Sequence, residues 1–182
     1  MATATEAVDV ILRDGRTLRL RPPRREDADS LLDFFGSLSE QSLYLRFHGF
    51  PTVDGRLVEP LLEPDWEERG ALLGTLAENG DERVVAVGNY VRLRDPSLAE
   101  AAFAVADEHQ KRGIGTRLLE RLADRAGRVG IERFVAEVLP DNRNMRGSSG
   151  RPRRCRRWSR DRPRRIRDQA RLHRADRRDD RC

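Results

Sequence analysis

The chain has 182 residues, of which 37% are charged, and its length favours a single domain. The net charge of +5 comes from the end of the chain, because residues 146–182 hold 16 Arg and 5 Asp, whereas residues 1–145 hold 20 basic and 26 acidic residues. Both cysteines, Cys155 and Cys182, lie in that basic segment, which excludes a disulfide framework or a cysteine-based metal site in residues 1–145. The sequence has no apolar run of the ~18 residues that a membrane span needs and no signal-peptide pattern, so we expect a cytoplasmic protein.

Alternating apolar and polar residues predict a β-hairpin near the start of the chain, after a flexible segment of residues 1–6. Its strands are expected over Val8–Leu12 and Thr17–Arg21, with a tight Asp-Gly turn between them. Apolar residues at helical spacing follow over Ala28–Leu38. Ser39 is the predicted N-cap of a second helix that ends near Phe47.

Two further strands are predicted over Ala71–Leu76 and Val84–Leu93, separated by a turn at residues 79–81. After them, a strand over Ala99–Val105 is followed by an amphipathic helix and by another strand over Arg133–Leu139. A strand, a crossover helix and a second strand form a parallel unit. The sequence therefore predicts an α/β (α+β) fold, with a mixed, mostly antiparallel sheet and helices on both of its faces.

The turn that precedes the amphipathic helix has features that favour an anion. Its sequence is Gln110-Lys111-Arg112-Gly113-Ile114-Gly115. The two glycines leave the backbone open, and the first amides of the helix have no intrahelical acceptor and carry the positive end of the helix dipole. A pyrophosphate suits such a site, although the spacing matches neither a Walker A loop nor G-x-G-x-x-G. The alternative is an ordinary solvated turn whose Lys111 and Arg112 side chains point into water.

The Q-x-x-G-x-G pattern, between an apolar strand and an amphipathic helix, resembles the coenzyme A pyrophosphate loop of the GNAT acyltransferase superfamily. Residues 18–49, LRLRPPRREDADSLLDFFGSLSEQSLYLRFHG, resemble the N-terminal half of GNAT domains of the bacterial protein lysine acetyltransferase type, which are often joined to an ADP-forming acyl-CoA synthetase-like region. Residues 133–145, RFVAEVLPDNRNM, resemble the next strand and the Asn-led start of the following helix. The resemblance covers residues 7–145 and implies a GNAT domain over that range.

This resemblance implies an N-acetyltransferase that moves the acetyl group of its cosubstrate acetyl-CoA directly to an amine, such as a lysine of an acyl-CoA synthetase. It implies that the pantetheine arm lies along the Ala99–Val105 strand, where that strand splays from the Arg133–Leu139 strand. Asn142 stands where the family's helix-start asparagine contacts the cofactor, although it is equally suited to an N-cap or turn. The implied cofactor-binding residues are Phe103, Val105, Gln110, Lys111, Arg112, Gly113, Ile114, Gly115, Thr116 and Asn142.

Glu100 is the single carboxylate in an otherwise apolar strand. We expect it to be partly buried among Ala99, Ala101 and Phe103 and to act as the general base, accepting a proton from the amine directly or through a water molecule. The resemblance agrees, because acetyltransferases of this type place a catalytic glutamate just before the apolar core of this strand. The alternative is an acid at the start of a strand that simply faces solvent.

Other candidate catalytic groups have less support. His48, His109 and His173 lack the spacing of metal ligands, so no metal site is expected. Many members of the superfamily use a tyrosine after the asparagine as general acid, but no tyrosine follows Tyr90 here. The acid role therefore falls to water or stays unassigned.

Residues 146–182 contain 7 apolar residues in 37 and show no periodicity, so we expect an Arg-rich disordered tail. The family continues here with the rest of a helix and two strands, so the GNAT domain is expected to be incomplete. We attribute the change to a frameshift near Met145, which resequencing tests: an intact alternative frame supports it and its absence refutes it. The tail is expected to adhere nonspecifically to nucleic acid. The alternative to an enzyme is a non-catalytic acyl-CoA-binding or regulatory module, or an inactive remnant of a larger synthetase-acetyltransferase fusion.

Overall fold

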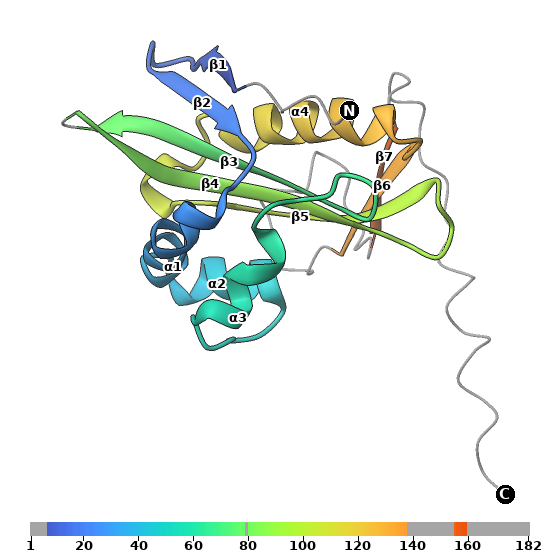
Figure 1. Cartoon of the computed structure of the whole chain (residues 1–182). Coiled ribbons are helices and arrows are strands. Elements are labelled where there is room, and N and C mark those ends of the chain that lie inside the picture. Colours follow the sequence, from blue (N-terminus) through green and yellow to red (C-terminus); the bar gives the residue numbers. More distant parts are fainter. Residues whose placement is uncertain (1–6, 79, 138–154, 160–182) are drawn as a thin grey trace, which may run out of the picture.

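The computed structural model describes residues 7–78, 80–137 and 155–159. They form one seven-stranded sheet whose strands lie side by side in chain order (Figure 1). Neighbouring strands are antiparallel except for one parallel pair, β5 and β6. The mixed, mostly antiparallel sheet predicted from the sequence is thus confirmed. The strands are β1 Val8–Ile11, β2 Thr17–Arg21, β3 Arg69–Glu78, β4 Asp81–Arg92, β5 Leu98–Val105, β6 Arg133–Glu137 and β7 Cys155–Ser159.

Helices cover both faces of this sheet, as the sequence predicts. The long helix α4 lies along one face, and α1, α2 and α3 gather on the other (Figure 1). Within the described residues, no helix has both the length and the apolar character required to cross a membrane. The helices are α1 Ala28–Gly36, α2 Glu40–Phe47, α3 Gly55–Val58 and α4 Ile114–Arg128, with single 3-10 turns at Arg25–Asp27, Glu59–Leu61 and Asp107–His109.

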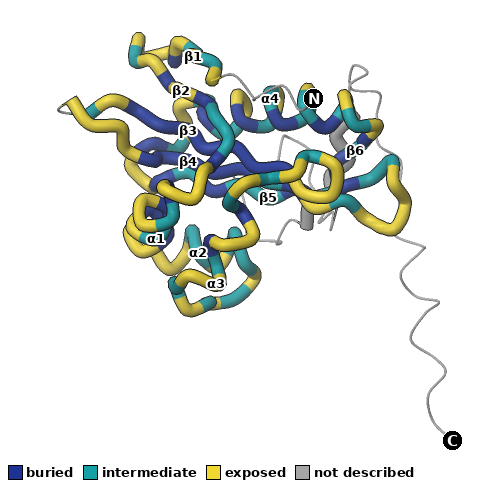
Figure 2. The backbone as a smooth tube through the Cα atoms, viewed as in Figure 1, coloured by how far each residue is buried: buried dark blue, intermediate teal, exposed yellow. Residues whose placement is uncertain are grey.

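The core has two layers because alternate strand residues point to opposite faces of the sheet. On the α4 face, helix residues at 3.6-residue spacing are buried against the strands, while the opposite side of α4 is exposed (Figure 2). On the other face, the apolar side of α1 packs onto β3, β4 and the end of β5. The buried helix residues are Ile114, Leu118, Leu122 and Ala126 in α4, and Leu31, Phe34 and Phe35 in α1.

The hairpin and the capped second helix are also confirmed. The Asp14-Gly15 turn closes with Gly15 at φ 81°, and the Leu12 amide donates to the Arg16 carbonyl over 2.9 Å. The Ser39 hydroxyl accepts from the Ser42 amide at the start of α2 over 3.2 Å. These features depend on residues close together in the chain, which is why local patterns predict them.

One stretch of the Arg-rich segment departs from the prediction of a disordered tail. Residues Cys155–Ser159 form β7, which pairs antiparallel with β6 from Glu137 opposite Cys155 to Arg133 opposite Ser159. The physical reason is that an edge strand offers unpaired backbone groups, and pairing with them requires no apolar periodicity in the added strand. The remainder of that segment, the boundary at residue 145 and residues 1–6 lie outside the described residues.

The contact between Gly70 and Tyr90 is a sensitive point of this fold. Tyr90 is fully buried and its hydroxyl donates to the Trp66 carbonyl over 2.5 Å, and a Cβ on Gly70 would lie 2.2 Å from Tyr90 Cε1. We expect Gly70→Ala to lower the free energy of unfolding by about 1–3 kcal/mol in a urea titration, because the ring is fixed at both ends. Gly36→Ala is the matched control, since a Cβ there meets nothing within 4 Å. Equal unfolding midpoints for the two variants would contradict this packing.

Candidate functional site

The loop between β5 and α4 leaves the N-terminal end of the helix open. Gly113 is the N-cap residue of α4 at φ 86°, and no side chain caps the helix there. Lys111 also has a positive φ, 63°, so that the backbone turns sharply before the helix. A Cβ placed on Gly113 would meet nothing within 4 Å. The first N–H groups of α4 therefore face an end that no side chain caps, a geometry that suits an anion.

Gln110 fixes this loop in place. Its side-chain amide donates to the Val105 carbonyl over 3.2 Å and to the Ser42 hydroxyl over 3.1 Å, joining the end of β5 to α2. Asp107 accepts from the Ser39 amide over 2.8 Å and from the Ser42 hydroxyl over 2.6 Å. Partial burial raises the pKa of Asp107, but these hydrogen bonds outweigh it and leave the pKa below its usual value. Gln110 and Asp107 thus anchor the loop.

The two loop cations differ in their surroundings. Lys111 is exposed. Arg112 lies 3.2 Å from the Asp14 carboxylate in the β1–β2 turn, and Asp14 also accepts from the Arg16 amide over 3.2 Å. The Arg16 amide, and then the side chains of Arg16 and Arg112, hold the pKa of Asp14 below its usual value against the effect of desolvation. An anion at the loop therefore competes with Asp14 for Arg112.

His109 lies next to the loop without pointing to a catalytic role. It is buried, and its Nδ1 lies 3.4 Å from Arg16 Nη2. Its Nε2 lies 3.6 Å from a Glu78 oxygen. Burial lowers the pKa of His109, so the neutral ring is favoured. These contacts join the loop to the β1–β2 hairpin and to the end of β3.

β5 and β6 are paired over a short stretch only. Their parallel ladder joins Leu98–Glu100 with Arg133–Val135 and goes no further within the described part of the chain. On its other side, β5 pairs with β4 from Ala99 to Val105. The edge of β5 that faces away from β4 thus lacks a described strand partner from Ala101 to Val105. The chain continues from Val105 through the loop to the uncapped start of α4.

Phe103 and Val105 point toward the α4 face of β5. Phe103 fits because its neighbour on β4 is Gly88, where a Cβ would lie 2.7 Å from the Phe103 ring. Gly115 lies beside Val105, since a Cβ on Gly115 would lie 3.8 Å from Val105 Cγ2. The predicted strand residues and the first turn of α4 are therefore brought together at the end of β5.

Glu100 does not have the predicted partial burial; it is exposed. Ala99 and Ala101 point toward α4, whereas Glu100 points to the opposite face, on which its β4 partner Val91 is 47% exposed. The reason is that α2, which lies against β5 on that face, leaves Glu100 and Val91 uncovered. The carboxylate is open to an incoming molecule.

Sequence reasoning did not identify two polar residues on the same face, Arg46 of α2 and Asn89 of β4. Arg46 Nη2 donates to Asn89 Oδ1 over 2.5 Å. Burial lowers the pKa of Arg46 to about 10, and the charge of Glu100 acts in the opposite direction. Arg46 stands inside an amphipathic helix and Asn89 inside an apolar strand, and no motif of local sequence distinguishes them.

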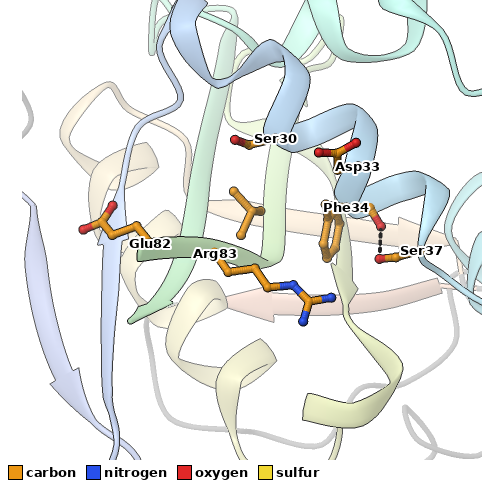
Figure 3. A pocket seen from close by; sticks show the side chains of 7 residues that line it. Ser30, Asp33, Phe34, Ser37, Glu82 and Arg83 are labelled. Carbon is orange, nitrogen blue, oxygen red and sulfur yellow. Dashed lines mark hydrogen bonds between the residues drawn. The ribbon is translucent and has the colours of Figure 1, made fainter. Parts of the chain in front are cut away.

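The remaining predictions fall elsewhere. Asn142 lies outside the described residues. Ile114 is buried at the start of α4 and Thr116 is exposed in its first turn. Among the described residues, no group of three His, Cys, Asp or Glu is placed to hold a metal ion. A hollow of about 220 Å³ between α1 and the start of β4 contains none of the predicted site residues (Figure 3); it is lined by Ser30, Asp33, Phe34, Ser37, Glu82, Arg83 and Val84.

Comparison with known proteins defines the class. The profile of the acetyltransferase (GNAT) family matches residues 39–147, more than half of the chain, and the chain belongs to this family. It is 33% identical to acetyltransferase Pat of Mycolicibacterium smegmatis over 147 aligned residues. The aligned stretch covers 80% of this chain and 44% of that protein. This chain therefore spans less than half of the length of that relative.

Two solved structures are similar in fold. The GNAT domain of S. lividans PAT superposes with a TM-score of 0.71 at 36% identity, over 80% of this chain and 85% of that one. The acetyltransferase yncA of Salmonella typhimurium, solved with its cofactor acetyl-CoA, has a TM-score of 0.56 at 22% identity, over 69% of this chain and 72% of that one. The GNAT-like fold predicted from the sequence is thus confirmed.

The anchoring role of Asp107 has a pH signature. We expect Asp107→Asn to lower the free energy of unfolding at pH 7 by about 1 kcal/mol, because it weakens bonds that a carboxylate accepts. The pKa of Asp107 is lower in the folded state than its usual value of 3.8. The hydrogen bonds that its carboxylate accepts therefore stabilise the fold fully above the usual, unfolded-state pKa. This stabilisation is lost as the pH falls through the folded-state pKa. Thermal unfolding from pH 7 to 3 should show the gap closing; a constant gap, or an equal one for the exposed Asp33→Asn, would contradict the assignment.

Proposed function

We propose that this chain binds acetyl-CoA between β5, β6 and the N-terminal end of α4, and transfers the acetyl group directly to an amine. The observation that carries the proposal is the early end of the β5–β6 ladder beside an uncapped helix. A free strand edge can pair with the amide groups of a pantetheine chain, and the helix end suits the pyrophosphate that follows it. Membership of the acetyltransferase family supports this choice of ligand.

In this proposal, the backbone N–H groups from Gly113 to Thr116 bind the pyrophosphate. Lys111 adds an exposed cation, and Arg112 exchanges part of its pairing with Asp14 for the anion. The thioester carbonyl lies beside the backbone of Phe103–Val105, where an N–H group stabilises the negative charge that develops on its oxygen. Asn142, which follows β6 in the sequence, is also proposed to contact the cofactor.

The chemical step is attack by the amine nitrogen on the thioester carbonyl carbon. A C–N bond forms, the C–S bond breaks, and coenzyme A leaves as a thiol after taking up a proton from solvent. Glu100 is proposed to accept the proton that the amine loses, directly or through water. Its exposure allows an acceptor to approach from solvent, and holding both reactants in one place supplies much of the rate.

The proposed acceptor is a lysine of another protein, such as an acyl-CoA synthetase. Similarity to proteins named Pat and PAT supports a protein acceptor. A second candidate is a non-catalytic module that binds an acyl-CoA. The observation that favours it is the exposure of Glu100, because a general base whose pKa is raised by burial would be at least partly buried. Binding without transfer distinguishes this candidate.

Coenzyme binding is tested at Gly115, where a side chain can be added without disturbing the core. We expect Gly115→Asp to keep or raise the unfolding temperature, because an acid suits a helix N-terminus. The same charge should weaken acetyl-CoA binding by roughly 10-fold or more in calorimetry, because it repels the pyrophosphate. Gly115→Ser is the neutral matched control and should lose less affinity. If Gly115→Asp binds acetyl-CoA as tightly as the original protein, the proposed site is wrong.

Catalysis is tested at Glu100. With purified acetyl-CoA synthetase as acceptor and acetyl-lysine measured by mass spectrometry, we expect Glu100→Gln to transfer roughly 100-fold more slowly or worse. Acetyl-CoA affinity should stay unchanged, because Glu100 lies on the other face of β5 from Phe103. Equal rates would remove Glu100 from the mechanism. Binding by both proteins with transfer by neither would favour the non-catalytic module.

A further inference from the structure

We propose that Arg46 is a positioning residue for Glu100: its guanidinium group, held by Asn89, keeps the Glu100 carboxylate in place on the exposed face of β5. This inference rests on the proposed function of Glu100 as the general base. It assigns to α2 a part in the reaction, in addition to covering the sheet.

Three elements meet at this point. α2 carries Arg46 and lies against β5. On β4, Asn89 lies opposite Ala102 and Val91 lies opposite Glu100, so Asn89 and Glu100 are on one face and one step apart along the ladder. The hydrogen bond of 2.5 Å from Arg46 Nη2 to Asn89 Oδ1 therefore fixes the cation next to the position of Glu100.

The partly buried position of the Arg46 guanidinium costs folding free energy. Its Nε is buried and has no hydrogen-bond partner, so part of the group's hydration is not replaced. Burial disfavours the charged form, and the Glu100 charge compensates in part. The Phe47 ring, with its centroid 4.7 Å from Arg46 Cζ, adds a cation–π contact. A buried charge is often less stabilising than an apolar residue of similar volume, so its presence calls for a role other than stability.

That role follows from the exposure of Glu100. A long exposed side chain samples several rotamers, and a general base must be held near one geometry by its neighbours. Other charged residues share this face by register: Arg133 of β6 lies opposite Leu98, and Arg69 of β3 lies opposite Val91 and pairs with Asp65. Arg133 lies one ladder step from Glu100, toward the start of β5. Arg46 is bonded to Asn89, which lies one ladder step from Glu100 in the other direction, toward Val105. Arg46 is thus the cation placed to draw Glu100 toward the proposed thioester position.

The test is a double-mutant cycle in the acetyl-CoA synthetase assay. We expect Arg46→Gln to lower kcat roughly 10-fold while the KM for acetyl-CoA stays unchanged, and Arg46→Lys to retain most of the rate because it retains the charge. In the Glu100→Gln background, Arg46→Gln should cause no further loss. The matched control is Arg128→Gln, which removes an exposed arginine at the end of α4, on the other face of the sheet.

Several results would overturn the proposal. A further loss caused by Arg46→Gln in the Glu100→Gln background would show that Arg46 acts through the fold and not through Glu100. If Arg46→Gln does not fold, Asn89→Ala, which removes the hydrogen bond that holds Arg46, carries the same cycle. If Glu100→Gln transfers normally, the proposed base fails, and with it the positioning role.

A second readout does not require transfer. With ¹³C-labelled glutamate carboxyls, the Glu100 signal is assigned as the one that Glu100→Gln removes. We expect this signal to move in Arg46→Gln and to stay in place in Arg128→Gln. An unmoved signal in Arg46→Gln would overturn the proposal even in a protein that transfers no acetyl group.

Discussion

The early end of the parallel ladder between β5 and β6 is the constraint on which the rest of the site depends. Three residue pairs join the two strands, and past Glu100 the described chain leaves one edge of β5 without a strand partner. The same strand continues into the loop that Gln110 fixes and that ends at the uncapped start of α4. A free edge and a helix N-terminus in succession suit a ligand that has amides in one part and phosphates in the next.

The sequence predicts the parts of this arrangement that are encoded locally. The spacing of Leu118, Leu122 and Ala126 defines the buried side of α4, and the Asp-Gly turn defines the hairpin. β7 could not be predicted in this way, because its pairing with β6 uses backbone groups and not side-chain periodicity. The exposure of Glu100 depends on how far α1, α2 and α3 extend over the sheet, which is a matter of tertiary packing.

The polar contacts around the site show the same division. The glycines and cations of the loop are visible as a motif, but the pairing of Arg112 with Asp14 brings together residues 98 positions apart. Arg46 and Asn89 are 43 positions apart and resemble ordinary members of a helix and a strand. Long-range electrostatic partners of this kind set the charge and orientation of a site, and a motif of six residues does not contain them.

Hydrogen exchange of the backbone amides, with and without acetyl-CoA, tests the central claim most directly. The account predicts slower exchange in two stretches, Ala101–Val105 on the free edge of β5 and Gly113–Thr116 at the start of α4, with little change in the β1–β2 hairpin strands. A folded protein in which saturating acetyl-CoA protects neither stretch would contradict the account.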